Sequence, residues 1–200
     1  MDARKFRFYV LLCGLLMICQ SLPTHAQQNS ISAVNPSTGR DGVHDFDWDI
    51  GTWNVHQRRL LHPLTGSTEW TEYDGTDVVQ KIWDGANMGK VESAGPTGRL
   101  EIYTLRLYDV AAHQWRIYFT SSGSGTLGQP VVGEFQNGRG EFYDQEPYRG
   151  KAILVRFSVH DITQNSCQFD QAFSADGGKT WETNFIATET LSKTPSPAPL

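Results

Sequence analysis

The chain has 200 residues, with 17 basic and 22 acidic side chains and a formal net charge of −5. This length suits one domain that can bury a core of its own. A mildly acidic chain without a block of basic residues argues against nucleic acid or an anionic membrane surface as the partner.

The N-terminus predicts a secretory signal peptide over residues 1–26. Basic residues within 4–7 precede the apolar run 9–19, and small residues stand at Thr24 and Ala26. The run is shorter than the roughly 20 residues of a membrane span, so an uncleaved anchor is the less favoured interpretation. We expect export to a bacterial periplasm or the extracellular space, and no membrane association after cleavage. The mature chain would keep 14 basic and 21 acidic residues, a net charge of −7.

Cleavage would also remove Cys13 and Cys19 and leave Cys167 alone, which excludes an internal disulfide. We interpret Cys167 as a packed or edge thiol rather than an activated nucleophile. Residues 27–43 and 192–200 are rich in small polar residues and proline, typical of a flexible linker and a disordered tail. The folded domain is therefore predicted over 44–191, without a prediction of its oligomeric state.

Short runs of alternating polar and apolar residues, separated by turn residues, predict an all-β domain. Strands are expected at 52–60, 68–73, 77–83, 87–93, 100–108, 114–121, 131–136, 139–145, 151–160, 166–175 and 180–190. Asn137-Gly138 is typical of a two-residue hairpin turn. About ten antiparallel strands with short links favour closure into an up-and-down barrel, because closure removes the exposed edges. A short lid is expected before the first strand.

The alternation also predicts which residues face the interior. A loop over 109–113 would place Tyr103 on the inner face, opposite a strand that begins near Trp115. The inner face would include Ile153, Val155, Phe157, Val159, Phe169, Phe173 and Ile186.

Residues 174–181 read Ser-Ala-Asp-Gly-Gly-Lys-Thr-Trp, and this spacing resembles the Asp-box hairpin that sialidases carry in several copies. One copy without a propeller repeat does not support a glycosidase. We interpret the segment as a hairpin turn, in which Gly177 and Gly178 adopt positive φ, Asp176 accepts hydrogen bonds from loop amides and Trp181 covers the turn.

This turn would direct polar residues inward. With a loop over 176–179, Glu182 lies opposite Phe173 and Asn184 opposite Gln171. Burying such groups without partners costs about 1–3 kcal/mol each. They either satisfy one another and water, or line a cavity and hold the polar end of a ligand. Glu182 is the candidate catalytic residue if the cavity performs acid–base chemistry of the isomerase or cyclase type.

Residues 44–55, with Gly51-Thr52-Trp53 at their centre, resemble the start of calycin barrels, which include lipocalins, fatty-acid-binding proteins and nitrobindins. The segments 105–109, 131–135, 140–143, 171–174 and 181–184 extend the resemblance to secreted bacterial lipocalin-like proteins of unknown function. The resemblance implies a small apolar or amphipathic ligand, with Tyr103, Trp53, Gln171, Glu182 and Asn184 as binding candidates. Calycin barrels often cover the tryptophan with a C-terminal arginine. This chain lacks one, so Trp53 would be covered by Arg58, Arg106 or Arg156.

No metal or cofactor is expected. Asp45, Asp47 and Asp49 have the spacing of a calcium loop, but Ile50 and His56 replace the required glycine and glutamate. We expect these carboxylates to lie on the solvated side of an apolar lid. A haem-binding, nitrobindin-like protein is a further alternative, but His56 and His160 are expected on the outer face of the barrel.

Overall fold

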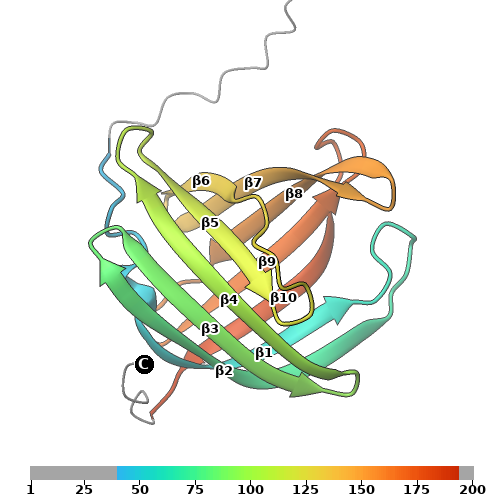
Figure 1. The fold of residues 1–200 in the computed structure, drawn as a ribbon, viewed down its shortest axis with the longest axis horizontal. Helices are drawn as coiled ribbons and strands as arrows, with labels where there is room; N and C mark the ends of the chain where they lie inside the picture. Colours follow the sequence, from blue (N-terminus) through green and yellow to red (C-terminus); the bar gives the residue numbers. More distant parts are fainter. Residues whose placement is uncertain (1–39, 194–200) are drawn as a thin grey trace, which may run out of the picture. The chain divides into compact units, whose positions relative to one another are not determined.

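The computed structural model describes residues 40–193, which form an antiparallel β-barrel preceded by a short N-terminal segment (Figure 1). The predicted signal peptide lies outside the described residues. The elements are the 3₁₀ helix η1 (Asp47–Asp49) and the strands β1 (Gly51–Leu60), β2 (Trp70–Trp83), β3 (Ala86–Gly95), β4 (Gly98–Asp109), β5 (Gln114–Ser121), β6 (Val131–Gln136), β7 (Arg139–Tyr148), β8 (Lys151–His160), β9 (Ser166–Ser174) and β10 (Glu182–Leu191).

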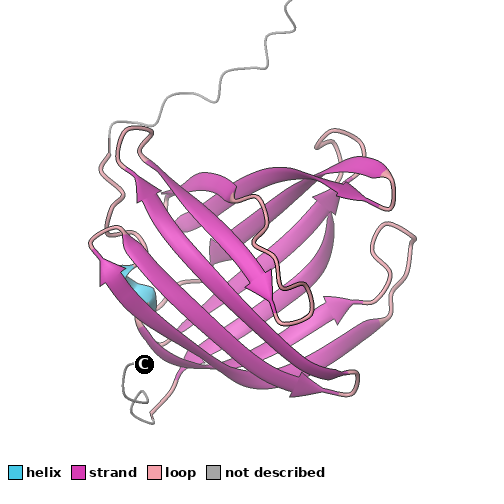
Figure 2. Ribbon diagram, viewed as in Figure 1, coloured by secondary structure: helices cyan, strands magenta, loops and turns pink. Residues whose placement is uncertain are grey.

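Each strand pairs with its neighbours in sequence, and β1 pairs with β10 to close the barrel. Figure 2 shows that strands make up nearly all of this unit, with one helical turn before the first strand. The predicted all-β, up-and-down barrel of about ten strands is confirmed. The bounds of β5, β6 and β8 coincide with those predicted.

The second strand differs from the prediction, which divided it into two. Residues 74–76 separate the predicted strands 68–73 and 77–83, but Gly75 lies within β2 and pairs with Val55 on one side and Ser93 on the other. A Cβ atom at Gly75 would approach the Glu92 carbonyl oxygen to 2.1 Å. Glycine here permits close contact between strands, so the chain continues as one long strand.

The Asn-Gly turn is confirmed. Asn137 and Gly138 have φ values of 53° and 76°, and Gln136 pairs with Arg139 across the turn. A two-residue loop with both central residues at positive φ matches the right-handed twist of the flanking strands.

One end of the barrel is closed by the segment that contains η1. Phe46 is fully buried, with its ring 5.0 Å from that of Trp115 and 4.9 Å from that of Phe135, both in edge-on geometry. The predicted lid, residues 44–50, is therefore a hydrophobic plug. The expected solvation of its carboxylates is wrong for Asp49, which is 0% exposed.

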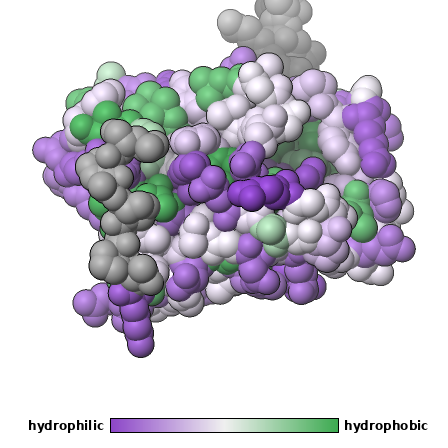
Figure 3. Space-filling model, turned by 60° about the horizontal axis from the view of Figure 1, so that its bottom comes forward, coloured by the Kyte–Doolittle hydropathy of each residue, from purple (hydrophilic) through white to green (hydrophobic). Residues whose placement is uncertain are grey.

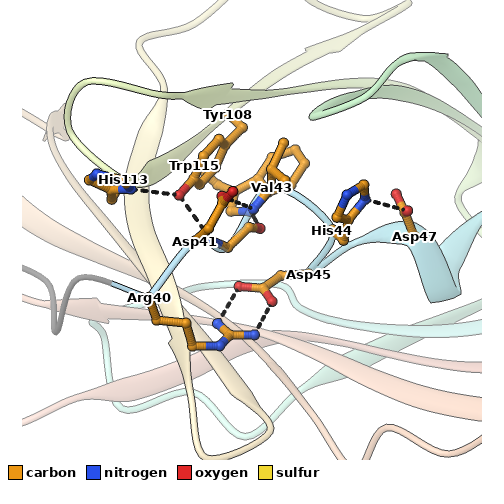
Figure 4. Close-up of polar contacts among 10 residues, drawn as sticks. Arg40, Asp41, Val43, His44, Asp45, Asp47, Tyr108, His113 and Trp115 are labelled. Carbon is orange, nitrogen blue, oxygen red and sulfur yellow. Dashed lines mark hydrogen bonds and ion pairs between the residues drawn. The ribbon is translucent and has the colours of Figure 1, made fainter.

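The residues before the plug also lie against the barrel (Figure 4). The Gly42 amide donates to the Tyr108 hydroxyl at 3.0 Å, and the Trp115 indole donates to the Gly42 carbonyl at 3.0 Å. Residues 40–43, predicted as part of the flexible linker, thus belong to the packed domain. The N-terminal boundary of the domain therefore lies earlier than predicted. The contacts that hold residues 40–43 involve backbone groups, and sequence composition does not reveal such contacts.

The outer surface is mixed in polarity. Figure 3 shows hydrophobic residues in small groups among hydrophilic ones on the face in view. Within residues 40–193, no helix combines the length and the hydrophobicity needed to cross a membrane.

Candidate functional site: a cavity inside the barrel

The barrel encloses a cavity of about 420 Å³, a volume typical of small-molecule sites. The lining extends from the neighbourhood of the plug to Leu61 and Pro63 in the β1–β2 loop. In Figure 1 the plug and this loop lie at opposite ends of the barrel. The cavity therefore has a floor near the plug and a mouth among the loops at the other end.

The walls of the cavity are aromatic. The Phe119 ring lies edge-on to that of Phe157 with centroids 5.2 Å apart, and Phe157 stacks on Phe169 at 5.7 Å. Other apolar lining residues are Leu60, Val91, Leu100, Ile102, Phe173, Phe185 and Ala187. The predicted inward face of β8 and β9 is confirmed by the burial of its residues. Such walls favour an apolar or aromatic ligand body.

The floor contains a buried ion pair. Arg106 Nη1 lies 2.6 Å from Asp49 Oδ2, with the two side chains 3% and 0% exposed. The same nitrogen donates to Asn87 Oδ1 at 3.0 Å. The guanidinium lies over the Phe46 ring at 4.9 Å from its centroid, so this pair joins the plug to the barrel wall.

Two further carboxyl groups lie beside this pair and line the cavity. Asp77 is 2% exposed and Glu189 is 3% exposed. Burial, together with the negative charge of Asp49, raises the pKa of Asp77 to about 7. Burial and the charges of Asp77 and Asp49 raise the pKa of Glu189 well above its usual value. One guanidinium cannot neutralise three carboxylates, so part of this group retains protons near neutral pH.

Asp49, Cys167 and Glu189 bring three potential ligand atoms within 4.8 Å of one another. A metal ion there would need the Cys167 thiolate, but burial raises the pKa of this thiol. The Arg106 guanidinium already supplies a positive charge to Asp49. The cluster is therefore better suited to hold protons and hydrogen bonds than a metal ion.

The predicted inward amide pair is present. Gln171 Nε2 donates to Asn184 Oδ1 at 2.9 Å, and both residues line the cavity. Asn184 is 3% exposed, and its Nδ2 has no hydrogen-bond partner among the described residues. The pair satisfies part of its own hydrogen-bonding capacity and leaves one buried donor free.

A β-bulge changes the remainder of β10. Glu182 pairs with Phe173 as predicted, but the register shifts between Thr183 and Phe185, so Gln171 pairs with Phe185. The shift exchanges the inner and outer faces of the strand beyond the bulge. Ala187 and Glu189 consequently line the cavity, and the predicted inward position of Ile186 is wrong. This is why sequence reasoning missed Glu189.

The candidate catalytic residue Glu182 is not among the residues that line the cavity. Its Oε1 accepts a 2.5 Å hydrogen bond from the Leu64 amide in the β1–β2 loop. Glu182 thus ties the start of β10 to the loop beside the mouth, opposite Phe173 as predicted but outside the cavity lining. The carboxylates that line the cavity are instead Asp77 and Glu189.

The predicted inward orientation of Tyr103 is also wrong. Trp115 pairs with Tyr108 rather than with Leu107, because the loop between β4 and β5 is one residue shorter than expected. Tyr103 is consequently 38% exposed on the outer face, while its neighbours Ile102 and Thr104 line the cavity. The same shift turns Arg106 inward.

Trp53 lies at the closed end of the barrel, outside the cavity lining. It is 1% exposed, its indole donates to the Asp49 carbonyl at 2.8 Å, and the Trp48 ring meets it edge-on at 6.1 Å. The plug thus covers Trp53. The three arginines that were predicted to cover Trp53 lie over other rings. Arg58 lies over Trp70, Arg106 over Phe46 and Phe169, and Arg156 over Trp181.

The histidines within residues 40–193 do not line the cavity. His56 binds Asp74 at 2.8 Å, and His160 binds Asp170 at 2.8 Å. The described part of the chain therefore offers no histidine as an axial haem ligand in this cavity.

Comparison with known proteins identifies the fold but no family. No family model matches the chain, and no curated protein matches it. Among solved structures, the S-type phycobiliprotein lyase CPES from Guillardia theta is similar, with a TM-score of 0.52, 14% identity and coverage of 78% of this chain and 96% of that chain. The Rv2717c protein from M. tuberculosis has a TM-score of 0.52, 10% identity and coverage of 77% and 99%. These similarities support the antiparallel β-barrel fold.

Proposed function

We propose that this protein binds a small apolar or amphipathic molecule inside its barrel. The observation that carries the proposal is the cavity of about 420 Å³, with aromatic walls and a polar floor. Apolar walls supply affinity by burying ligand surface, and a few polar groups fix the orientation of the ligand. The similar lyase, whose name refers to phycobiliproteins, is compatible with a ligand held in such a barrel.

We also propose that the protein acts after export. This part rests on the sequence of residues 1–26 alone, with its basic start, apolar run and small residues at the end. N-terminal sequencing of protein from fractionated cells should find a mature chain that begins at Gln27 outside the cytoplasm. A cytoplasmic chain that retains residues 1–26 would contradict export.

Binding can be tested with the fluorescent neutral probe N-phenyl-1-naphthylamine and with octan-1-ol as competitor. We expect enhanced probe fluorescence that octan-1-ol reverses. Ala187→Leu fills the cavity and should weaken probe binding about tenfold or more, because it removes space for apolar contact. Ala86→Leu is the matched control, since Ala86 is equally buried but lies outside the cavity lining. A folded wild-type protein that binds neither compound would contradict the proposal.

One observation favours a second function, acid–base catalysis. Asp77 lines the cavity with a pKa of about 7, the range in which a carboxyl group both accepts and donates protons at neutral pH. Exchange of α-hydrogens of cyclohexanone into D₂O, followed by NMR, is a direct test. Catalysed exchange that disappears in Asp77→Asn, while octan-1-ol still binds, would support this function. Equal exchange in both proteins would exclude Asp77 as the base.

A further inference from the structure

The floor of the cavity has an excess of acidic groups. Asp49, Asp77 and Glu189 lie together, and among the described residues Arg106 is the cation within this group. Arg59 also lines the cavity, but it is exposed and belongs to the mouth end of β1. When all three carboxyl groups are ionised, the floor carries a net charge of −2. The aromatic walls add no formal charge that would compensate it.

The floor also has polar atoms without partners. Asp77 lines the cavity at 2% exposure, and its Oδ1 has no hydrogen-bond partner among the described residues. A buried acceptor without a partner costs about 1–3 kcal/mol, which a ligand donor would recover. The Arg106 nitrogen Nη1 is already engaged by Asp49 and Asn87, whereas its Nε has no hydrogen-bond partner among the described residues. An anionic ligand that bound this guanidinium would lie beside the acidic side chains of the floor, whose negative charges oppose it.

We propose that the cavity selects ligands with a basic nitrogen, whose protonated amine binds Asp77 and Glu189 while the apolar body lies along the phenylalanine walls. This inference deepens the proposed function and rests on it. A protonated amine carries donors and no acceptor, as the lysine ammonium does, and so matches carboxylate oxygens.

Binding of a cation is coupled to release of protons. The groups that face Asp77 are Asp49 on η1, Arg106 on β4, Cys167 on β9 and Glu189 on β10. Because Asp77 has a pKa of about 7 in the free protein, an adjacent cation will lower this pKa and displace a proton. Affinity for an amine should therefore rise between pH 6 and pH 8. Affinity for a neutral alcohol should not change.

The test compares three compounds of equal chain length, octylamine, octan-1-ol and octanoate, by displacement of N-phenyl-1-naphthylamine at pH 8. We expect octylamine to bind about tenfold or more tightly than octan-1-ol, as expected for one hydrogen bond between charged groups. Octanoate should bind most weakly. Octan-1-ol binding as tightly as octylamine, or octanoate binding best, would overturn this inference and leave the proposed function intact. Failure of all three to displace a bound probe would overturn it too, and failure of the probe itself to bind would overturn both proposals.

Two isosteric variants locate the selectivity. Asp77→Asn and Glu189→Gln keep the shape of the floor, so each should lower octylamine affinity about tenfold and leave octan-1-ol affinity unchanged. Calorimetry of octylamine binding to the wild-type protein in two buffers of different ionisation enthalpy should detect proton release at pH 7. Equal enthalpies in both buffers, or unchanged octylamine affinity in both variants, would overturn the assignment.

Discussion

The two ends of the barrel hold aspartates in opposite environments. At the mouth end, Asp176 in the turn between β9 and β10 is surrounded by donors. Its Oδ1 accepts from the Lys179 amide at 3.0 Å and the Thr180 amide at 2.9 Å, and its Oδ2 accepts from the Thr180 hydroxyl at 2.7 Å. Hydrogen bonds from Thr180 and Ser174 lower the pKa of Asp176 to about 2. At the floor, burial and like charges raise the pKa of Asp77 to about 7.

The two carboxylates differ in how many of their hydrogen-bond acceptors are occupied, and this difference indicates different roles. Asp176 has its hydrogen-bonding capacity occupied by its own loop, as predicted for a hairpin turn. Gly177 and Gly178 have φ values of 75° and 88°, and the Trp181 indole donates to the Gly178 carbonyl at 3.1 Å. Asp77 retains a free acceptor inside a cavity. The first carboxylate stabilises a turn, whereas the second is available to a ligand.

Removing the cation of the floor should give the largest effect. Arg106→Leu leaves Asp49 buried without its ion-pair partner, and loss of one partner of a buried pair costs about 3–5 kcal/mol. Urea unfolding should report this loss. Arg116→Leu is the matched control, because Arg116 binds Asp109 at 3.0 Å at the surface. We expect a much smaller loss there. Similar losses of unfolding free energy in the two variants would contradict a larger cost for breaking the buried ion pair than for breaking the surface one.

The pH dependence of stability should distinguish the floor from the turn. Because Asp77 binds its proton more tightly in the folded state, the stability from this group is complete below its unfolded pKa of 3.8 and is lost as the pH rises through about 7. The free energy of unfolding should fall by about 2–3 kcal/mol between pH 5 and pH 8. Glu189 acts in the same direction. Asp77→Asn should remove the part of this fall that Asp77 contributes, and a pH profile identical to that of the wild-type protein would contradict the raised pKa.

The smallest effect is expected at the turn. The pKa of Asp176 is lowered, so its contribution to stability is present above pH 3.8 and is lost as the pH falls through about 2. Asp176→Ala should therefore reduce stability at pH 6 modestly and remove the share of the acid-side loss between pH 4 and pH 2 that Asp176 contributes, as followed by urea unfolding. Octylamine affinity should be unchanged. A weakened amine affinity would show that the turn and the floor are not separate in function.

Much of the fold follows from local patterns. The alternation of apolar residues predicted the bounds of β5, β6 and β8, and Asn137-Gly138 predicted its own turn. The contact between Gln171 and Asn184 was also predicted, because a short loop brings the two strands together. These features depend on residues close in sequence.

Tertiary structure decided which side chains face the cavity. A loop shorter by one residue turned Tyr103 outward and Arg106 inward, and a bulge after Thr183 did the same for Ile186 and Glu189. Because side chains alternate between faces, a shift of one residue exchanges the two faces of a strand. The sequence by itself determined a closed barrel and the hydrogen-bonded turn of its final hairpin. Only the closed structure could bring Asp49, Asp77, Arg106 and Glu189 together, since these residues come from four separate elements and meet only when the plug and the strands pack around one interior.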